Sequence, residues 1–492
     1  MRLSELFSKA GVTPDWQNGD PVVGTLCADS RELQPGQGFV AMPSANSDTS
    51  GFVADAVKKG AAAVIASNEA TWNTAVGLGV PVAVVQTGFE DALWRLAAES
   101  YGRPSASMRL AGITGTNGKT TTAWIMRDAL AALGCRAAYL GTLGYRTDGP
   151  LVGLRNTTPF AVETQALLRN AADEGVDALV MEVSSHALDQ KRVDGVEFDA
   201  AVFTNLTQDH LDYHLTMEVY RDAKLRLFRD LPRASAKAFR GAWNASAGSG
   251  LDREWFEMGM LDYAVDGDAA LRAETVEVAL DHLTVRLTFE GRQAMLKAKL
   301  GGGYNVENCV SATAGLLCLG YSLDDAVRSL ASATPVPGRM EAIANSCEVT
   351  VIVDYAHTPD AYERVLQTVR PLTRGRLIFL FGCGGDRDRT KRPLMAKAAS
   401  SLADVVVLTS DNPRTEDPEQ IMSDTRQGFA GSAEVHEIAD RREAVFAAVR
   451  MAQPGDTVIL AGKGHENYQI VGHDKLPWDD RQVAREALEA RS

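Results

Sequence analysis

The segment Thr114–Thr122, with the sequence TGTNGKTTT, has the residue types and order of a phosphate-binding loop. The short apolar run Arg109–Ile113 precedes it, and apolar residues at helical spacing follow it. A glycine turn that opens a helix directs backbone N–H groups and the helix dipole toward one point, which favours a phosphate. Lys119 would balance the outer phosphates and the Thr120 hydroxyl is placed to bind Mg²⁺, although a strict motif has glycine where Ile113 stands. We predict a nucleoside triphosphate site, which kinases, switches, transport ATPases and ligases all share.

A second group of residues could hold a hard cation beside the phosphates. Glu182 ends an apolar run, His210 and His214 stand four residues apart in NLTQDHLDYH, and Lys224 follows. Ligands of open α/β sheets bind at the carboxyl ends of the strands, where a carboxylate and a histidine would join the Thr120 hydroxyl. Two alternatives remain for the histidines, a capping or surface pair and a zinc site. The Asp-rich loop around them favours magnesium.

The elements that must position these residues alternate along the 492-residue chain. Short β-branched runs are separated by Ala- and Leu-rich helical stretches, a pattern typical of parallel sheets covered by helices. The fold class is therefore α/β, with a different, antiparallel pattern at Leu283–Phe289 and a loop at Gly241–Gly250. Segments rich in proline and glycine predict domain boundaries that divide the chain into residues 1–107, 108–335 and 336–492. The expected strands are Ala61–Ala66, Val82–Val85, Arg109–Ile113, Ala178–Val183, Val349–Asp354, Leu377–Phe381, Val405–Thr409 and Thr457–Ala461.

Composition excludes several classes of protein. The formal net charge of −14 argues against binding to nucleic acid or to a membrane surface, which both need cationic patches. The first residues lack the apolar stretch of a signal peptide, and no run approaches the length of a membrane span. The six cysteines form no C-x-x-C pair and are too sparse for a disulfide scaffold. We expect a cytoplasmic, multidomain protein without membrane insertion.

Several further motifs occur in one order along the whole chain. Together with the loop at 114–121, they resemble the ATP-dependent Mur ligases. The motifs are Glu182–His186 (EVSSH), Asn205–His214, Gly338–Glu341 (GRME), Asp354–Asp360 (DYAHTPD), Phe381–Asp388 (FGCGGDRD), Asp411–Arg414 (DNPR) and Gly462–Glu466 (GKGHE).

The resemblance implies a three-domain architecture. An N-terminal domain would bind the UDP substrate, a central P-loop ATPase domain of mostly parallel sheet would bind ATP, and a Rossmann-like C-terminal domain would bind an amino acid. Within the family, the motifs resemble members that add meso-2,6-diaminopimelate to UDP-N-acetylmuramoyl-L-alanyl-D-glutamate in cell-wall precursor synthesis. ATP would phosphorylate the D-glutamate γ-carboxylate, and the amine would attack the acyl phosphate. The implied partners are ATP, Mg²⁺ and these two substrates, without nucleic acid, and the expected state is a monomer.

The resemblance also assigns the ATP and metal residues. Lys119, Glu182, His210 and Lys224 are implied to be catalytic, and Lys224 matches the lysine that the family carries as a carbamate, here an N6-carboxylysine. That modification would turn a cation into a carboxylate-like metal ligand. The implied metal ligands are Thr120, Glu182, His210 and Lys224. The implied ATP contacts are Gly115, Thr116, Asn117, Gly118, Lys119, Thr120, Thr121, Asn305, Arg339, Asp354 and His357.

Two further residue sets are implied to bind the other substrates. Arg414 would pair with the distal carboxylate that distinguishes diaminopimelate from lysine, and Glu466 suits an ammonium group. The UDP-substrate contacts are Ala28, Ser30, Asn156, Thr157, Thr158, Ser184, Gln190 and Arg192. The amino-acid contacts are Arg387, Asp411, Asn412, Pro413, Arg414, Gly462 and Glu466.

The chain departs from the family pattern in the first domain and after His214. Leu215 stands where glycine is common, the segment 44–51 matches poorly, and Ala28 replaces a larger apolar residue. The alternatives are a lysine-adding or other Mur-type ligase, a folylpolyglutamate-synthase-like ligase, and a P-loop NTPase module without ligase chemistry. A dinucleotide-binding oxidoreductase would rest on Gly382–Gly385, which lacks the full glycine spacing.

Overall fold

A computed structural model describes residues 1–42, 50–230, 232–241, 255 and 258–491. The chain divides into two compact units, the first comprising Met1–Ala264, Asp268–Leu271 and Ser311–Ser329, the second Val265–Gly267, Arg272–Val310 and Leu330–Ser492. Most of segment 44–51 and of the loop expected at Gly241–Gly250 lies outside the described residues. Among the described helices, none has the length and apolar character needed to cross a membrane.

The first unit begins with a five-stranded sheet in the order β1-β5-β4-β3-β2. Only the edge strand β1 is antiparallel to its neighbour β5, and the other pairings are parallel. Apolar side chains are buried on both faces of this sheet. Its strands are β1 (Asp15–Gln17), β2 (Leu26–Cys27), β3 (Gly38–Val40), β4 (Ala63–Ala66) and β5 (Val82–Val84), and its helices are α1 (Leu3–Ala10), α2 (Ser50–Lys58), α3 (Glu69–Gly77) and α4 (Phe89–Ser100), followed by the short helix η1 (Pro104–Ser107).

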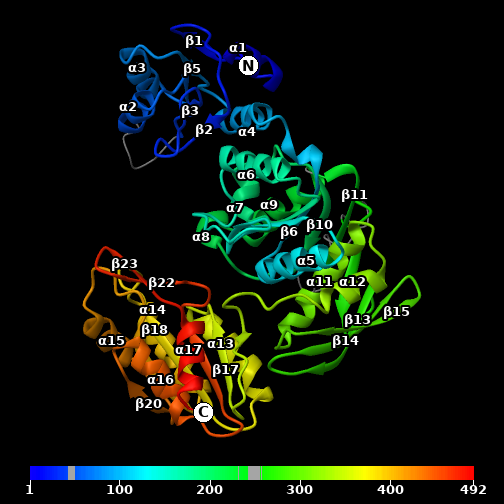
Figure 1. Ribbon diagram of the computed structural model, residues 1–492, viewed down its shortest axis with the longest axis vertical. Helices are drawn as coiled ribbons and strands as arrows, with labels where there is room; N and C mark the ends of the chain where they lie inside the picture. Colours follow the sequence, from blue (N-terminus) through cyan, green and yellow to red (C-terminus); the bar gives the residue numbers. More distant parts are fainter. Residues whose placement is uncertain (43–49, 231, 242–254, 256–257, 492) are drawn as a thin grey trace. The chain divides into compact units, whose positions relative to one another are not determined.

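The first unit continues with strands in the order β12-β11-β10-β6-β9-β7-β8. Figure 1 labels β6, β10 and β11 of this sheet. All neighbouring pairs are parallel except the hairpin pair β7 and β8. The strands are β6 (Arg109–Thr114), β7 (Ala137–Gly141), β8 (Gly144–Arg146), β9 (Ala178–Glu182), β10 (Phe198–Phe203), β11 (Pro232–Gly241) and β12 (Leu261–Val265). The helices are α5 (Lys119–Ala132), α6 (Ala161–Asp173), α7 (Ser185–Asp189), α8 (Leu211–His214) and α9 (Met217–Arg229).

Three more strands and two helices precede the C-terminal region. Strands β13 (Leu271–Val278), β14 (Leu283–Phe289) and β15 (Arg292–Ala298) are adjacent, and β14 pairs antiparallel with β15 from Leu283 opposite Ala298. This pairing confirms the antiparallel strand expected at Leu283–Phe289. Helices α11 (Tyr304–Cys318) and α12 (Leu323–Leu330) follow.

The C-terminal region of the second unit holds a six-stranded sheet in the order β16-β17-β21-β18-β19-β20. Only the short edge strand β16 is antiparallel. A separate hairpin, β22–β23, follows β21. The strands are β16 (Glu341–Ala342), β17 (Thr350–Asp354), β18 (Leu377–Cys383), β19 (Val405–Ser410), β20 (Glu434–Glu437), β21 (Thr457–Ala461), β22 (Tyr468–Val471) and β23 (Asp474–Pro477), and the helices are α13 (Pro359–Val369), η3 (Arg370–Leu372), α14 (Lys391–Leu402), α15 (Pro418–Arg426), α16 (Arg441–Met451) and α17 (Asp480–Glu489).

Strand β18 shows why the apolar runs fold this way. Phe379 and Phe381 are buried in one apolar cluster, with Tyr362 of α13, whereas Ile378 and Leu380 are buried in a second cluster on the other face. Because strand side chains alternate between faces, a run that is apolar throughout needs helices on both sides. The α/β fold class and every expected strand are confirmed. The three-way division at 107 and 335 stays a prediction.

Candidate functional site

The phosphate-binding loop connects β6 to α5, as its sequence predicts. Gly115 and Gly118 have φ angles of 143° and 83°, in the region that favours glycine. A Cβ atom on Gly115 would lie 2.0 Å from the Thr204 hydroxyl oxygen, so a side chain has no room there. Thr204 in turn donates to the Asn117 carbonyl at 2.5 Å, and the Asn117 N–H donates to Asn205 at 2.9 Å. Thr204 and Asn205, which directly follow β10, therefore hold the loop in a fixed shape.

Two lysines converge on this loop. Lys119 Nζ donates to the carbonyls of Gly115 and Thr116, each at 2.9 Å. Lys224 Nζ, on α9, donates to the same Gly115 carbonyl at 2.8 Å and is almost fully buried. It also lies 4.5 Å from the centroid of the Tyr220 ring. Burial, together with the nearby Lys119 charge, lowers the pKa of Lys224 well below its ordinary value.

Glu182 lies at the centre of a dense hydrogen-bond network at the end of β9. Its Oε1 accepts from the Tyr139 hydroxyl at 2.5 Å and from the Thr142 N–H at 2.9 Å. Its Oε2 accepts from the hydroxyls of Thr120 at 2.9 Å and Thr142 at 3.1 Å. The loop approaches so closely that a Cβ on Gly141 would lie 2.2 Å from Oε1. The carboxylate is fully buried, so these donors fix its orientation.

His210 and His214 lie with His186 in an aromatic cluster next to Tyr220. The His186 ring is 4.8 Å from that of His210 and 5.4 Å from that of His214, centroid to centroid. His214 is buried and bonds through Nε2 to the Ser185 hydroxyl at 3.0 Å, and burial lowers its pKa. In the part of the chain that the structure describes, no three His, Cys, Asp or Glu side chains are close enough to hold one metal ion.

The loop after His214 has an unusual backbone. Leu215 has φ 66° and ψ −44°, and the Thr216 N–H donates back to the His214 carbonyl at 2.8 Å. This three-residue γ-turn is rare and strained for a residue with a side chain. The Leu215 side chain is 77% exposed, so little burial offsets the strain. The departure from glycine noted in the sequence thus has a structural consequence.

Most residues assigned to the UDP substrate form one connected group beside Glu182. The Thr158 hydroxyl donates to the Glu182 carbonyl at 2.8 Å and accepts from the Ser184 N–H at 3.1 Å. Arg192 donates to the Thr158 carbonyl at 2.9 Å and to the Gln190 side chain. Thr157 bonds to Thr142 at 3.1 Å.

The segment around Asp29 lies near that group. Ser30 is buried, Ala28 packs against an apolar cluster of the five-stranded sheet, and Arg155 forms an ion pair of 3.1 Å with Asp29. Asp29 is also held by Arg31, whose charge and hydrogen bonds lower the pKa of the Asp29 carboxyl. Asn156, next to Arg155, is half-buried.

The other residues assigned to ATP lie in the second unit, where protein groups contact their side chains. Asp354 accepts from the Met340 and Ala356 N–H groups, both at 2.8 Å, and burial raises its pKa. Asn305 is buried and donates to the Gly301 carbonyl at 2.6 Å. His357 Nδ1 is hydrogen-bonded to the Tyr355 carbonyl at 2.9 Å. Arg339 Cζ and the His357 ring centroid each lie 4.8 Å from the centroid of the Tyr355 ring.

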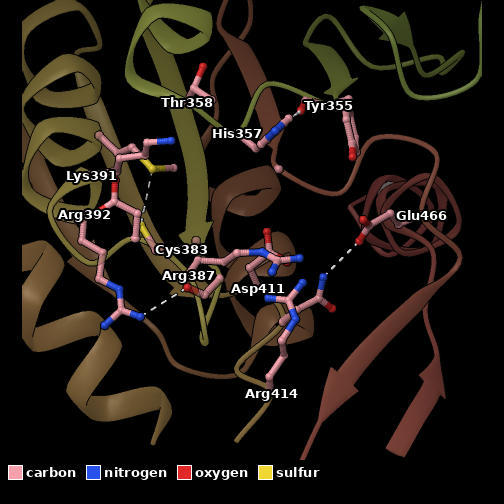
Figure 2. A pocket seen from close by; sticks show the side chains of 16 residues that line it. Tyr355, His357, Thr358, Cys383, Arg387, Lys391, Arg392, Asp411, Arg414 and Glu466 are labelled. Carbon is pink, nitrogen blue, oxygen red and sulfur yellow. Dashed lines mark hydrogen bonds between the residues drawn. The ribbon is translucent and has the colours of Figure 1, made fainter. Parts of the chain in front are cut away.

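A pocket of about 400 Å³ opens at the carboxyl ends of β18, β19 and β21 (Figure 2). Six of the seven residues assigned to the amino acid line it: Arg387, Asp411, Asn412, Arg414, Gly462 and Glu466. Pro413 does not line it, and its carbonyl accepts from the Glu416 N–H at 3.1 Å. His357, assigned to ATP, lines the same pocket.

The charges in this pocket are unevenly matched. Figure 2 shows Arg387 and Arg414 reaching toward its middle, with Glu466 across from them. Arg392 is paired with Glu416 and Asp424, at 2.8 Å each. Within the described residues, Arg387 and Arg414 have no carboxylate partner, and the Arg414 guanidinium donates only to the Gly385 carbonyl at 2.7 Å. Two guanidinium groups are thus available to a carboxylate ligand.

Sequence reasoning missed the groups that hold these residues in place. Lys463, inside the GKGHE motif, is fully buried below the pocket, and hairpin β22–β23 bonds to its wall. Tyr139 and Thr142, which hold Glu182, were also missed. A lysine flanked by glycines in an otherwise assigned motif was the one available signal.

Two family models match the chain. The Mur ligase middle domain matches residues 113–316, and the Mur ligase, glutamate ligase domain matches residues 338–464. The chain is 41% identical over 495 residues to UDP-N-acetylmuramoyl-L-alanyl-D-glutamate--2,6-diaminopimelate ligase from Geobacillus thermodenitrificans, with 100% of each chain covered. It is 43% identical to the protein of the same name from Synechococcus elongatus, over 96% of this chain and 95% of that one.

Solved structures give the same result. A ligase of that name aligns with a TM-score of 0.66 at 34% identity, over 95% of both chains. Folylpolyglutamate synthase from Thermotoga maritima aligns with a TM-score of 0.61 at 18% identity, over 81% of this chain and 93% of that one, which shows a shared fold alone. Taken with the phosphate loop and the matched domains, these similarities establish that the chain belongs to the Mur ligase family.

Proposed function

We propose that this Mur ligase uses ATP to join meso-2,6-diaminopimelate to UDP-N-acetylmuramoyl-L-alanyl-D-glutamate. The γ-carboxylate of D-glutamate would take the terminal phosphoryl group of ATP, and the amine would then attack the acyl phosphate and release phosphate. The curated relatives carry this activity in their names. The proposal includes action as a monomer in the cytoplasm.

The observation that carries the proposal is the charge pattern of the 400 Å³ pocket. A diaminopimelate molecule has two carboxylates and two ammonium groups, whereas lysine has one carboxylate. Arg387 and Arg414 offer planar donors to a carboxylate, and Glu466 offers an acceptor to an ammonium. An arginine left without its carboxylate in a partly closed pocket costs binding energy, so the same group that accepts diaminopimelate also disfavours lysine.

The phosphate loop supports ATP as the phosphoryl donor. Lys119 now donates to two loop carbonyls, and these bonds could be exchanged for phosphate oxygens without moving the backbone. The proposed UDP-substrate residues Thr158, Ser184 and Arg192 belong to the network that contains Glu182. This connection favours a substrate carboxylate bound close to the phosphates.

The residues around Glu182 also suit Mg²⁺. The Thr120 hydroxyl and the Glu182 carboxylate supply hard oxygen ligands, and the two groups are hydrogen-bonded to each other at 2.9 Å. We include His210 in the proposed site. Bound Mg²⁺ would neutralise phosphate charge while the acyl phosphate forms. Lys224 completes the proposed set as a carbamate, and its lowered pKa favours the neutral amine that reacts with CO₂.

The test separates a ligase from an NTPase without ligase chemistry. Phosphate release is measured with ATP and Mg²⁺, adding the UDP substrate and the amino acid singly and together. We expect release only when both are present, with a new amide in the nucleotide product by mass spectrometry. Release that is the same without the amino acid would overturn the proposal.

Lys224 offers a second test of the same function. Lys224→Ala should lose activity that added short carboxylates partly restore, because they replace the missing carbamate. A fully active Lys224→Ala enzyme would remove the carbamate from the mechanism. Lys237, which is also in the first unit but outside the site, provides the control as Lys237→Ala.

A further inference from the structure

Lys463 is a fully buried cation that the proposed reaction does not use. Its side chain is 0% exposed and lies behind Asp411 and Asn412, which line the amino-acid pocket. Nζ donates to Asn412 Oδ1 at 2.5 Å and to the Tyr468 carbonyl at 3.1 Å. It also lies 3.2 Å from Asp411 Oδ1 and 3.5 Å from Glu466 Oε2. A buried lysine with this many acceptors has a defined geometry.

These contacts decide which way the Asn412 amide faces. Its Oδ1 accepts from Lys463 Nζ and from the Ile470 N–H at 2.9 Å. Both partners are obligatory donors, so the atom facing them must be the oxygen. The amide nitrogen is then on the opposite side, where it donates to Glu466 Oε2 at 3.1 Å. Because Nδ2 carries two N–H groups, one stays available to a ligand in the pocket.

The same contacts tie the pocket to hairpin β22–β23. Gln469 donates to the Asp411 carbonyl at 2.6 Å, and the Arg414 N–H donates to the Ile470 carbonyl at 3.1 Å. Lys463 is linked to β22 through its hydrogen bond to the Tyr468 carbonyl. The ammonium thus connects the hairpin, Asn412 and two carboxylates at one point.

We propose that Lys463 is a positioning residue for the amino-acid substrate. Lys463 orients the Asn412 amide so that its N–H groups face the pocket. Its ammonium also keeps the carboxylates of Asp411 and Glu466 close to each other. Its charge offsets theirs, so that the pocket can present a carboxylate to an ammonium and an amide N–H to a carboxylate. This inference rests on the proposed function, because it names how that pocket binds its acceptor.

The first experiment compares Lys463→Met with the wild-type enzyme in the phosphate-release assay. The loss of a charge-assisted hydrogen bond predicts a rise of about 10- to 100-fold in the KM for diaminopimelate. The KM values for ATP and the UDP substrate should not change. Lys475→Met is the matched control, because Lys475 lies on the same hairpin, 3.6 Å from the Tyr468 ring centroid, and is exposed. It should behave as wild type.

A double-mutant cycle distinguishes positioning from a general loss of structure. If Lys463 acts through Asn412, then Asn412→Ala combined with Lys463→Met raises the KM for diaminopimelate no further than the larger single effect. Independent, multiplicative effects would overturn the proposal. An unchanged KM in Lys463→Met, with wild-type acceptor dependence intact, would overturn it while leaving the proposed function standing. A wild-type enzyme without acceptor-dependent release would overturn both.

A second variant covers the case in which Lys463→Met does not fold. Asn412→Asp keeps the size of the side chain and keeps an oxygen facing Lys463, but it removes the donor on the pocket side. Its KM for diaminopimelate should rise at least about 10-fold, with the KM for ATP unchanged. A wild-type KM for diaminopimelate in Asn412→Asp would show that the orientation of the amide is irrelevant and would refute the proposal.

Discussion

Tyr139→Phe removes one hydroxyl from the network around Glu182 and leaves the ring in place. The ring is fully buried and packs edge-on against Trp124, with 5.4 Å between centroids, so phenylalanine keeps this packing. The hydroxyl donates to Glu182 Oε1 at 2.5 Å and accepts from the Leu143 N–H at 3.3 Å. The substitution leaves the buried carboxylate with only the Thr142 N–H on that oxygen.

The expected cost follows from the charge of the acceptor. A hydrogen bond to a charged group contributes about 1.5–3 kcal/mol, so the free energy of unfolding should fall by that amount. If Glu182 has to be held in place for the reaction, kcat/KM falls too, by at most about 10- to 150-fold, since each 1.4 kcal/mol is tenfold. Activity is retained in part, because the donors to Oε2 are unchanged.

Urea denaturation followed by circular dichroism measures the first quantity, and phosphate release measures the second. Tyr145→Phe is the control, because its hydroxyl bonds to the neutral acceptors Leu167 O at 3.2 Å and Asn170 Oδ1 at 2.9 Å. The control should lose only about 0.5–1.5 kcal/mol and little activity. Equal losses of stability and activity in the two variants would refute the claim that the charged acceptor strengthens the Tyr139 hydrogen bond.

Three further predictions concern single positions. Leu215→Gly should raise the free energy of unfolding by up to about 1 kcal/mol in urea titrations, because it relieves a strained γ-turn at an exposed residue; a loss of stability would contradict this. Gly115→Ala should abolish ATP binding in calorimetry, because the new Cβ would lie 2.0 Å from the Thr204 hydroxyl; wild-type affinity would refute the steric argument. Burial and the Arg339 charge lower the pKa of His465 to about 4, so the neutral imidazole contributes fully to stability above pH 6.5 and this contribution decreases as the pH falls toward 4. Between pH 6.5 and pH 5 the free energy of unfolding should therefore fall by about 2 kcal/mol more in the wild type than in His465→Gln, and equal decreases would contradict this prediction.

The sequence predicted the fold well because the fold depends on contiguous patterns. An apolar run such as Leu377–Phe381 can be buried on both faces only between layers of helices, and the structure places it so. The phosphate loop was equally accessible, since strand, glycines, lysine and helix follow one another directly along the chain. Residues that are adjacent in the sequence are therefore sufficient to predict this loop, without knowledge of distant contacts.

The supporting residues could not be predicted, because their roles depend on distant partners. Lys463 orients a side chain 51 residues earlier in the chain, and Tyr139 holds a carboxylate 43 residues later. Neither spacing has a sequence signature. Asp354 was assigned to ATP from its motif, yet its carboxylate is occupied by two backbone N–H groups. Nothing in the sequence reveals how many protein donors a carboxylate already has.

The central claim is that the pocket around Arg414 selects an amino acid with a second carboxylate. The most direct test is the ratio of kcat/KM for meso-diaminopimelate to that for L-lysine, measured with saturating ATP, Mg²⁺ and UDP-N-acetylmuramoyl-L-alanyl-D-glutamate. We predict a large ratio in favour of diaminopimelate that falls at least about 10-fold in Arg414→Ala, because a bidentate charge-assisted pair is lost. A ratio near one in the wild-type enzyme, or one that Arg414→Ala leaves unchanged, would contradict the account.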